Sequence, residues 1–534
     1  MAEALEDLCG DHPGARIGEL ARHWTAATQP IDLIRAIGYS HQAGDAALAS
    51  LAPADALHYY AQALDLYART IDSDLGLGID LGIGLGTAQR QTGDPAFRET
   101  LLEAARRAVD IGDTERLVAA ALANNRGWVS SAGTIDTDRV EMLELALDRL
   151  SGDSHDRALV LATLCSELVF STASERRQAL AREALSIARA HGDEAIILRV
   201  LNIAFNPIEM SEALTWSADA LSRAQRLGDP VQLFLAADRR SVAACRAGDM
   251  REVDRCLELM GSTVERLVQP SLNWVLAFVR AMRAQVAGDP DEAERLALEA
   301  LRIGTEIGEP DATIIFGAQL AIVSLQRGIM GDLAPFIEEA AAENPGLPGF
   351  VAALAVAHSE GGRTDEARDL LDELAAVDFD VPEDVTWLTT MVSYSDAAIQ
   401  CGDPRYAAPL FDRLAPWGDL WSTTMGPTVE GPVSLFLGGL ASVLRRYDQA
   451  DAYFAQSAAS SERADAKYFG ARTNLLWGKM LADRRGTGDI EKAQDLLTKA
   501  HLSGAANGYG TVARRAETAL QLLDALQPND GSPA

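Results

Sequence analysis

Apolar residues recur in two different helical patterns between residues 274 and 310. The stretch WVLAFVRAMRAQVA, residues 274–287, is apolar on almost every side, so it predicts a helix that is buried over most of its surface. In residues 291–310, apolar and small side chains recur every three or four positions, which predicts a helix with one apolar stripe. Two antiparallel helices of these kinds form a hairpin, and neither helix buries its apolar surface without neighbouring hairpins.

The tripeptide Gly-Asp-Pro at residues 288–290 separates these two predicted helices. Glycine accepts the left-handed conformation that ends a helix, aspartate caps the next helix, and proline suits its first position. The same tripeptide begins at Gly93, Gly228 and Gly402. It therefore marks tight turns between helices along most of the chain.

Gly-Asp pairs recur with a spacing near 40 residues. Pairs at 112, 152, 192 and 228 follow one set of predicted helices, and pairs at 248 and 288 lie inside hairpins. A period of about 40 with two helices per unit is typical of tetratricopeptide-like repeats, which usually have about 34 residues. The sequence predicts an all-α fold, an α-solenoid that forms a right-handed superhelix of such hairpins.

The length of 534 residues also favours stacked repeats, because it exceeds what one compact core supports, whereas a solenoid grows along one axis. We expect a helical junction over residues 1–50 and two solenoid segments over 51–342 and 350–526. The segment ENPGLPG at 343–349 is the predicted hinge between them, and residues 527–534 are predicted to form a disordered tail.

The net charge of −31 and the sequence pI near 4.6 argue against direct binding to nucleic acid or anionic membranes. The five cysteines show no C-x-x-C spacing, which predicts reduced, mostly buried thiols in a cytoplasmic protein. The first residues, MAEALEDL, are acidic where an export signal would be basic, and the longest apolar run is too short to span a bilayer.

Motifs of catalysis are missing from the sequence. It contains no Walker phosphate loop, no G-x-S-x-G elbow and no H-E-x-x-H pair. Glycines alternate with Leu and Ile over residues 76–86, which predicts close helix packing rather than a dinucleotide loop. We therefore expect no catalytic residue, no cofactor and no metal; an acid–base pair assembled by the fold is the alternative.

Two stretches hold more polar and aromatic side chains than packing alone requires. The candidate partner-binding residues are Asn124, Asn125, Arg126 and Trp128 in the first stretch, and Trp417, Trp421 and Glu430 in the second. Aromatic and arginine side chains on the inner surface of a solenoid suit a peptide or partner site. The structural alternative, which we favour, is that tryptophans fill hairpin corners and polar groups cap helix ends.

Four stretches resemble one known family. They are ALANNRGWVSSAGTIDTDRVEMLELAL, ERRQALAREALSIARAHGDEA, EGPVSLFLGGLASVLRRYDQADAYFAQSAA and YFGARTNLLWGKMLADRRGTGD. They resemble the C-terminal helical-repeat region of actinobacterial STAND-type signalling ATPases, which carry a P-loop ATPase with an adenylate/guanylate cyclase or a LuxR-type helix-turn-helix. The resemblance covers essentially the whole chain. It implies repeats that sense a ligand or partner and restrain an attached ATPase, and it assigns no role to a single residue.

Three hypotheses follow. The first is a non-catalytic interaction or regulatory protein that binds a peptide, protein or small effector on its concave face, in signalling or transcriptional control. An ATPase, a cyclase or a transcription regulator is the expected protein partner, without direct contact to nucleic acid or membrane. The second is a truncated or split part of an ATP-binding cyclase or LuxR-type regulator whose active domains lie outside this chain. The third is a self-contained solenoid enzyme.

Overall fold

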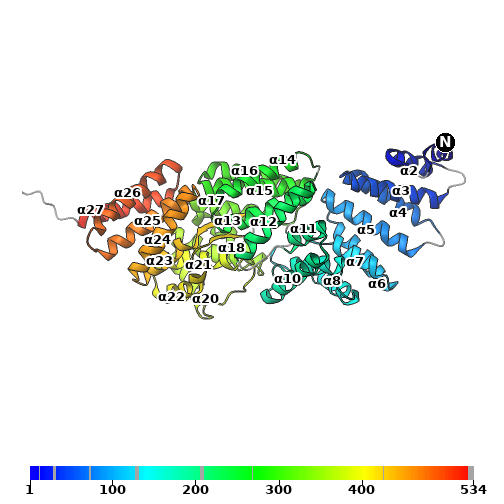
Figure 1. Ribbon diagram of the computed structural model, residues 1–534. Coiled ribbons are helices and arrows are strands. Elements are labelled where there is room, and N and C mark those ends of the chain that lie inside the picture. Colours follow the sequence, from blue (N-terminus) through cyan, green and yellow to red (C-terminus); the bar gives the residue numbers. More distant parts are fainter. Residues whose placement is uncertain are drawn as a thin grey trace, which may run out of the picture.

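The computed structural model is an elongated stack of helices, with the N-terminal helices at one end and the C-terminal helices at the other (Figure 1). Successive helices pack against each other along nearly the whole chain. The predicted all-α solenoid is confirmed. The structure describes residues 1–10, 13–27, 32–70, 74–126, 132–204, 210–267, 269–424 and 426–526.

In the first half of the chain, helices are the only regular elements among the described residues. Its elements are α1 (Ala2–Cys9), η1 (Gly14–Arg16), α2 (Ile17–Thr25), α3 (Leu33–Ala49), α4 (Pro53–Tyr67), α5 (Leu75–Thr92), α6 (Phe97–Asp110), α7 (Thr114–Ala123), α8 (Thr137–Arg149), α9 (His155–Glu167), α10 (Ser174–His191), α11 (Glu194–Ile203) and α12 (Met210–Leu227).

The second half continues the helical pairs and adds one β-hairpin. Its elements are α13 (Pro230–Arg246), α14 (Met250–Val264), α15 (Pro270–Ala287), α16 (Pro290–Glu306), α17 (Ala312–Arg327), η2 (Met330–Leu333), α18 (Ala334–Glu343), α19 (Gly349–Glu360), α20 (Thr364–Ala375), α21 (Trp387–Cys401), α22 (Pro404–Leu414), η3 (Ala415–Trp417), β1 (Trp421–Thr424), β2 (Thr428–Pro432), α23 (Val433–Val443), α24 (Tyr447–Arg463), α25 (Lys467–Arg484), α26 (Asp489–Asn507) and α27 (Gly510–Leu526).

The repeat length agrees with the spacing of the sequence signals. Helices α13, α15 and α17 begin at Pro230, Pro270 and Ala312, so successive hairpins are offset by 40 and 42 residues. Within the second hairpin, α15 buries side chains around most of its circumference, Trp274 and Phe278 included, whereas α16 buries one stripe of small residues. Both helices follow the predicted patterns.

The turns between helices confirm most of the predicted capping. Gly288 and Gly402 have φ of 82° and 67°, the left-handed region that glycine adopts without strain. The carboxylate of Asp289 accepts the backbone N–H of Glu292 at 3.0 Å and so caps α16. The prediction is wrong at the tripeptide of residues 93–95, because α6 begins only at Phe97 and its N-cap residue is Ala96, without a side-chain cap.

The glycines of α5 serve close packing, as predicted. A Cβ added to Gly84 would lie 2.2 Å from the ring of Tyr60, and one added to Gly86 would lie 2.5 Å from Leu101. The apolar core divides near this helix. One cluster runs from residue 2 to 88 and the other from 79 to 523, while the predicted boundaries at 50 and 343–349 stay predictions.

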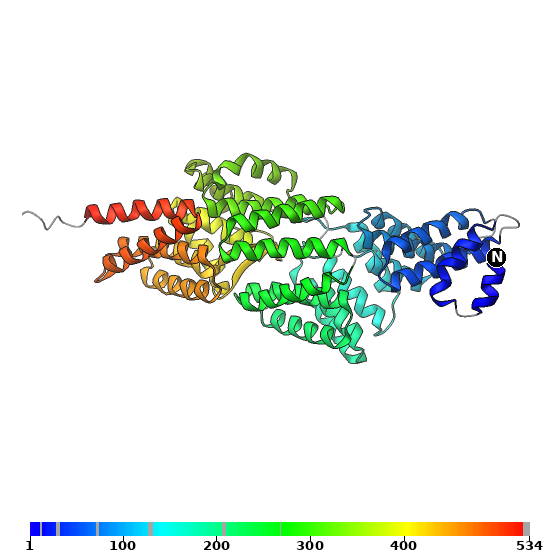
Figure 2. The same cartoon turned by 90° about the horizontal axis from the view of Figure 1, so that it is seen from above.

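The second half of the solenoid curls back on itself. Helix α25 contacts α15, and α27 contacts α17, so the first residues of the C-terminal helices meet the ends of the middle ones (Figure 2). The hydroxyl of Tyr509 donates to the carbonyl oxygen of Gly288 at 2.7 Å, and Arg515 pairs with Glu360 at 3.1 Å. We call α13 to α27 the closed turn.

The β-hairpin lies inside the closed turn. We call α13 to α19 the first arm of the closed turn and α20 to α27 its second arm. Strands β1 and β2 pair antiparallel, and they contact α13, α15 and α17 of the first arm and α21 and α23 of the second. Glutamine side chains hold its backbone, because Gln285 and Gln319 donate to the carbonyl oxygens of Val429 and Pro427 at 3.2 and 2.9 Å. The sequence predicted only a stretch without helical period here.

Two further sequence expectations concern the thiols and the apolar run. Cys165, Cys245 and Cys256 are buried, and Cys9 and Cys401 are half-buried, in line with the prediction of mostly buried thiols. Across the described ranges, every helix is too short or too polar to cross a membrane. The predicted tail at 527–534 lies outside the described residues.

Candidate functional site

A cavity of about 480 Å³ lies within the closed turn. One wall comes from α17, η2, α18 and α19, and the opposite wall comes from α21, the β-hairpin, α23 and α25. Ala132 and Phe170, from the first half of the chain, also line it. Its size falls within the range of small-molecule pockets, roughly 300–1,000 Å³.

Small residues create this space. Gly317, Ala318 and Ala321 of α17 and Ala353 of α19 line the cavity, and none of them reaches far across it. The side chain of Phe336 in α18 also lines it and is 69% exposed, so the cavity opens to solvent there. The result is an accessible, mainly apolar chamber.

One buried ion pair spans two of the cavity helices. Arg472 of α25 donates to the carboxylate of Asp396 of α21, and both side chains are at least nine-tenths buried. The guanidinium carbon of Arg472 also lies 5.7 Å from the centre of the Phe436 ring. Each charge is therefore neutralised by its partner, as burial requires.

The carboxyl group of Glu430 in β2 is surrounded by hydroxyls. Its Oε2 accepts from Ser422 Oγ at 2.8 Å and from Thr389 Oγ1 at 3.1 Å, and its Oε1 accepts from Thr428 Oγ1 at 2.8 Å. Burial raises the pKa of Glu430, and the three hydroxyl donors oppose that rise. The hydrogen bonds fix the carboxyl group between α21 and the two strands.

Thr390 is a polar residue of a different kind. Its side chain lines the cavity and is fully buried, yet its hydroxyl finds no hydrogen-bond partner among the described residues. A buried hydroxyl without a partner is unfavourable, commonly by about 1–3 kcal/mol. A bound molecule that reaches this hydroxyl would supply the hydrogen bond that it lacks.

Among the predicted site residues that the structure describes, Glu430 is the one that lines the cavity. Trp421 is buried in the core of the closed turn, where its indole N–H donates to Ser460 at 2.8 Å. Trp417 lies outside the lining, with its ring 5.6 Å from that of Trp387. The second predicted patch is thus a β-hairpin whose tryptophan anchors it and whose glutamate faces the cavity.

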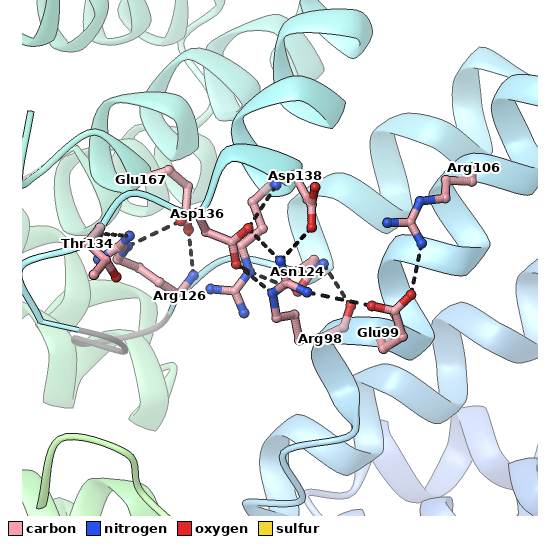
Figure 3. Close-up of polar contacts among 10 residues, drawn as sticks. Arg98, Glu99, Arg106, Asn124, Arg126, Thr134, Asp136, Asp138 and Glu167 are labelled. Atoms are coloured by element: carbon pink, nitrogen blue, oxygen red, sulfur yellow. Dashed lines mark hydrogen bonds and ion pairs between the residues drawn. The ribbon is translucent and has the colours of Figure 1, made fainter.

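The first predicted patch is a network of charged side chains, partly buried, between α6, α7, α8 and α9 (Figure 3). The backbone N–H of Arg126 donates to Glu167 Oε1 at 2.6 Å, and its guanidinium Nε donates to Oε2 at 3.2 Å. The side chains of Arg126 and Glu167 are 2% and 0% exposed. Arg98 holds Asp136 with two hydrogen bonds of 2.6 and 2.8 Å. We call these residues, with Asn124, Asn125 and Arg139, the Arg126 network.

The two asparagines of this patch bond within the same network. Asn124 donates to the carbonyl oxygen of Arg98 at 3.1 Å and accepts from Arg139 at 3.2 Å. Asn125 accepts from Arg90, whose pKa burial lowers to about 10, with neighbouring Arg139 adding to the effect. Their amides are used in holding buried arginines, while Trp128 lies outside the described residues.

Phe170 joins the two patches. The guanidinium carbon of Arg126 lies 5.7 Å from the Phe170 ring, and the ring itself lines the cavity. The Arg126 network thus supports one wall of the cavity from outside. In the described part of the chain, no three His, Cys, Asp or Glu side chains gather as a metal site.

The sequence prediction missed the polar residues of α21 and α25, chiefly Thr390, Asp396 and Arg472. A signal for them was present. Helix α21, WLTTMVSYSDAAIQC, carries hydroxyls and a carboxylate on a helix whose other residues are mainly apolar. Polar side chains on a helix buried from most sides must find partners or bind something.

No protein-family model and no curated protein matches this chain. Among solved structures, it is similar to the APC/C hetero-tetramer Cut9–Hcn1, at 15% identity and a TM-score of 0.42 over 97% of this chain and 90% of that chain. It is also similar to Naa15/Naa10 bound to HypK, at 13% identity and a TM-score of 0.21 over 96% and 95% of the two chains.

A circular tandem repeat protein is similar at 14% identity and a TM-score of 0.13, over 98% of this chain and 96% of that chain. At these TM-scores the likeness carries no argument about function. On its own architecture, the chain is a helical-repeat protein, an all-α solenoid that encloses a β-hairpin and an apolar cavity.

Proposed function

We propose that this chain is a non-catalytic regulatory protein that binds a small effector in the cavity of its closed turn. The cavity carries the proposal, because it combines about 480 Å³ of space with mainly apolar walls and a small set of polar groups. This combination is typical of small-molecule sites. Of the three ligand kinds that the sequence suggested, a small effector suits this volume best.

The position of the cavity lets a bound ligand change the curvature of the solenoid. Its walls come from α17–α19 of the first arm and from α21–α25 of the second arm of the closed turn. Helices of the closed turn pack mainly against their neighbours in sequence, and the contacts of α15 with α25 and of α17 with α27 are small by comparison, so a change of curvature disturbs little packing. A ligand that contacts both arms favours one curvature over others, which is a population shift.

The output of this shift would be a changed surface for a protein partner. The resemblance to STAND-type regulators suggests an ATPase, a cyclase or a transcription regulator as that partner, in signalling or transcriptional control. The net charge of −31 argues against a direct output on nucleic acid. The effector site and the partner surface are separate parts of the proposal.

Nile red, an uncharged apolar dye, tests the effector site. We expect its fluorescence to rise on binding the protein and the rise to disappear in Ala353→Trp, since an indole at this position fills the cavity. The matched control is Ala505→Trp on the exposed surface of α26, which should bind the dye as the wild type does. Equal binding by all three proteins, each shown to be folded by circular dichroism, would overturn the proposed site.

Small-angle scattering tests the coupling to shape. Saturation with Nile red is expected to change the radius of gyration of the wild-type protein and to leave that of Ala353→Trp unchanged. Dye binding without any change in the scattering curve would retain the site and refute the effect on curvature.

A further inference from the structure

We infer that the cavity selects an uncharged, mainly apolar molecule with one hydrogen-bonding group, and that the Thr390 hydroxyl contacts that group. This inference rests on the proposed function and narrows it to one chemical class of effector. It depends on three observations: how the charges of the lining are paired, where a hydroxyl is left without a partner, and how few polar groups the walls offer.

The charges of the lining leave none available for an ionic ligand. Among the described lining residues, the acidic and basic side chains are Asp396, Arg472 and Glu430. The first two neutralise each other as a buried pair. Glu430 is held by three hydroxyls on β1, β2 and α21, and burial favours its neutral form. A charged ligand would enter without a counter-charge and would lose its hydration.

The unpartnered hydroxyl gives the site a polar contact. Thr390 Oγ1 is fully buried and without a partner among the described residues, although its side chain lines the cavity. A threonine hydroxyl both donates and accepts, so a ligand hydroxyl, carbonyl or amide satisfies it. By contrast, Ser393 also lines the cavity, but its hydroxyl already donates to the Thr389 carbonyl oxygen at 2.9 Å.

A peptide segment fits this lining poorly. Every residue of an extended peptide brings one N–H and one C=O group into the site, and each needs a partner once water is excluded. The wall formed by α17, α18 and α19 is lined by glycine, alanine, aliphatic and phenyl side chains. The hydroxyls on the opposite wall are mostly engaged with Glu430 or with each other. A molecule with few polar groups avoids this deficit.

Competition against Nile red tests the ligand class with four probes. Decanol, decanoate and decylamine share one ten-carbon chain and differ in the charge of the head group, and an acetylated, amidated Leu-Ala-Leu peptide is the fourth. We expect decanol to displace the dye at concentrations at least about tenfold lower than the other three, because burying an unpaired charge or an unpaired amide is unfavourable.

Two variants test the role of Thr390. In Thr390→Val we expect decanol affinity to fall by about two- to tenfold, the range of one hydrogen bond. In Ser395→Ala, whose hydroxyl is paired within the same helix and lies outside the cavity lining, decanol affinity should stay unchanged. An equal loss in both variants, or no loss in Thr390→Val, would remove Thr390 from the inference.

The outcomes separate the inference from the proposed function. If decanoate, decylamine or the peptide displaces the dye as well as decanol does, the ligand class is wrong and the effector site stands. If Nile red does not bind at all, or binds Ala353→Trp as it binds the wild type, the proposed function fails together with the inference.

Discussion

The Arg126 network and the cavity show two opposite ways to build the inside of one solenoid. The network fills its space with arginines, carboxylates and amides that bond to each other, and Arg126 and Glu167 are almost fully buried. The cavity leaves its space open, with small residues on one wall and the unpartnered hydroxyl of Thr390 on another. Phe170 touches both.

The difference teaches which residues in a repeat protein point to a ligand. Arginine, asparagine and tryptophan attract notice in a sequence, but in this chain they mostly hold helices together. The residues that leave room for a molecule are alanines, glycines and a threonine. These residue types occur throughout the sequence. The comparison predicts large stability effects in the network and, in the cavity, small stability effects with large effects on binding.

The largest expected effect is in the Arg126 network. Glu167→Ala removes the carboxylate that accepts from the backbone N–H and the Nε of Arg126, while the guanidinium keeps its hydrogen bond to the Thr134 carbonyl oxygen, so unfolding should become easier by about 3–5 kcal/mol. Chemical denaturation measures this. Nile red binding per folded molecule should persist, and the double variant Arg126→Met with Glu167→Leu should recover part of the stability. A loss below about 1 kcal/mol would contradict the structural role.

The second-largest effect is expected at the contacts of α25 and α27 with α15 and α17, which we call the seam of the closed turn. These contacts hold the cavity walls together. Gly288 and Gly402 share the Gly-Asp-Pro turn and a positive φ, but a Cβ on Gly288 would lie 2.1 Å from the Tyr509 hydroxyl, whereas one on Gly402 meets nothing within 4 Å. We expect Gly402→Ala to lower stability by about 1–2 kcal/mol and Gly288→Ala by about 1–3 kcal/mol more.

Thermal unfolding of the two glycine variants, with Nile red binding as a second measurement, checks this difference. Only Gly288→Ala should also weaken dye binding. Equal melting temperatures for the two variants would show that the Tyr509 contact does not hold the seam.

We expect folding stability to depend on pH at the place where the Arg126 network and the cavity meet. Asp311 Oδ1 accepts the backbone N–H of Ala132 at 3.0 Å, and burial, with Asp311 nearby, raises the pKa of Glu309 from 4.5 to about 7. Between these two pKa values the folded protein binds more protons than the unfolded chain, so Glu309 makes stability fall as pH rises through this window.

The upper limit of this fall is about 3–4 kcal/mol, and the actual fall is smaller because the Glu309 side chain is half-buried. Denaturation of the wild type and of Glu309→Gln at several pH values isolates it. The stability difference between the two proteins should change between about pH 4.5 and 7 and then level off. A difference that is independent of pH would refute the assignment.

The smallest stability effect is in the cavity. Thr390→Val removes a buried hydroxyl without a partner and keeps the shape of the side chain, so stability should stay constant or rise by up to about 1 kcal/mol. The denaturant midpoint measures this change in stability, and the decanol competition described above measures the loss of binding. A fall in stability would mean that the hydroxyl supports the fold, and the contrast with the Arg126 network would then disappear.

Much of the fold follows from the sequence by itself. The Gly-Asp-Pro turns, the period near 40 and the contrast between α15 and α16 are local signals, because caps and helical stripes depend on residues a few positions apart. They predicted the hairpins and the solenoid. They also placed Glu430 in a stretch without helical period, although not in a β-hairpin.

Only the tertiary structure decided where the solenoid closes and what it encloses. The Tyr509–Gly288 hydrogen bond joins residues 221 positions apart in the sequence. The ion pair of Arg472 with Asp396 joins residues 76 positions apart. No local pattern encodes such meetings, because they depend on small rotations summed over many repeats. The same summation leaves a cavity between α17 and α25 and fills the space around Arg126. The chain thus specifies its units locally and its candidate site globally.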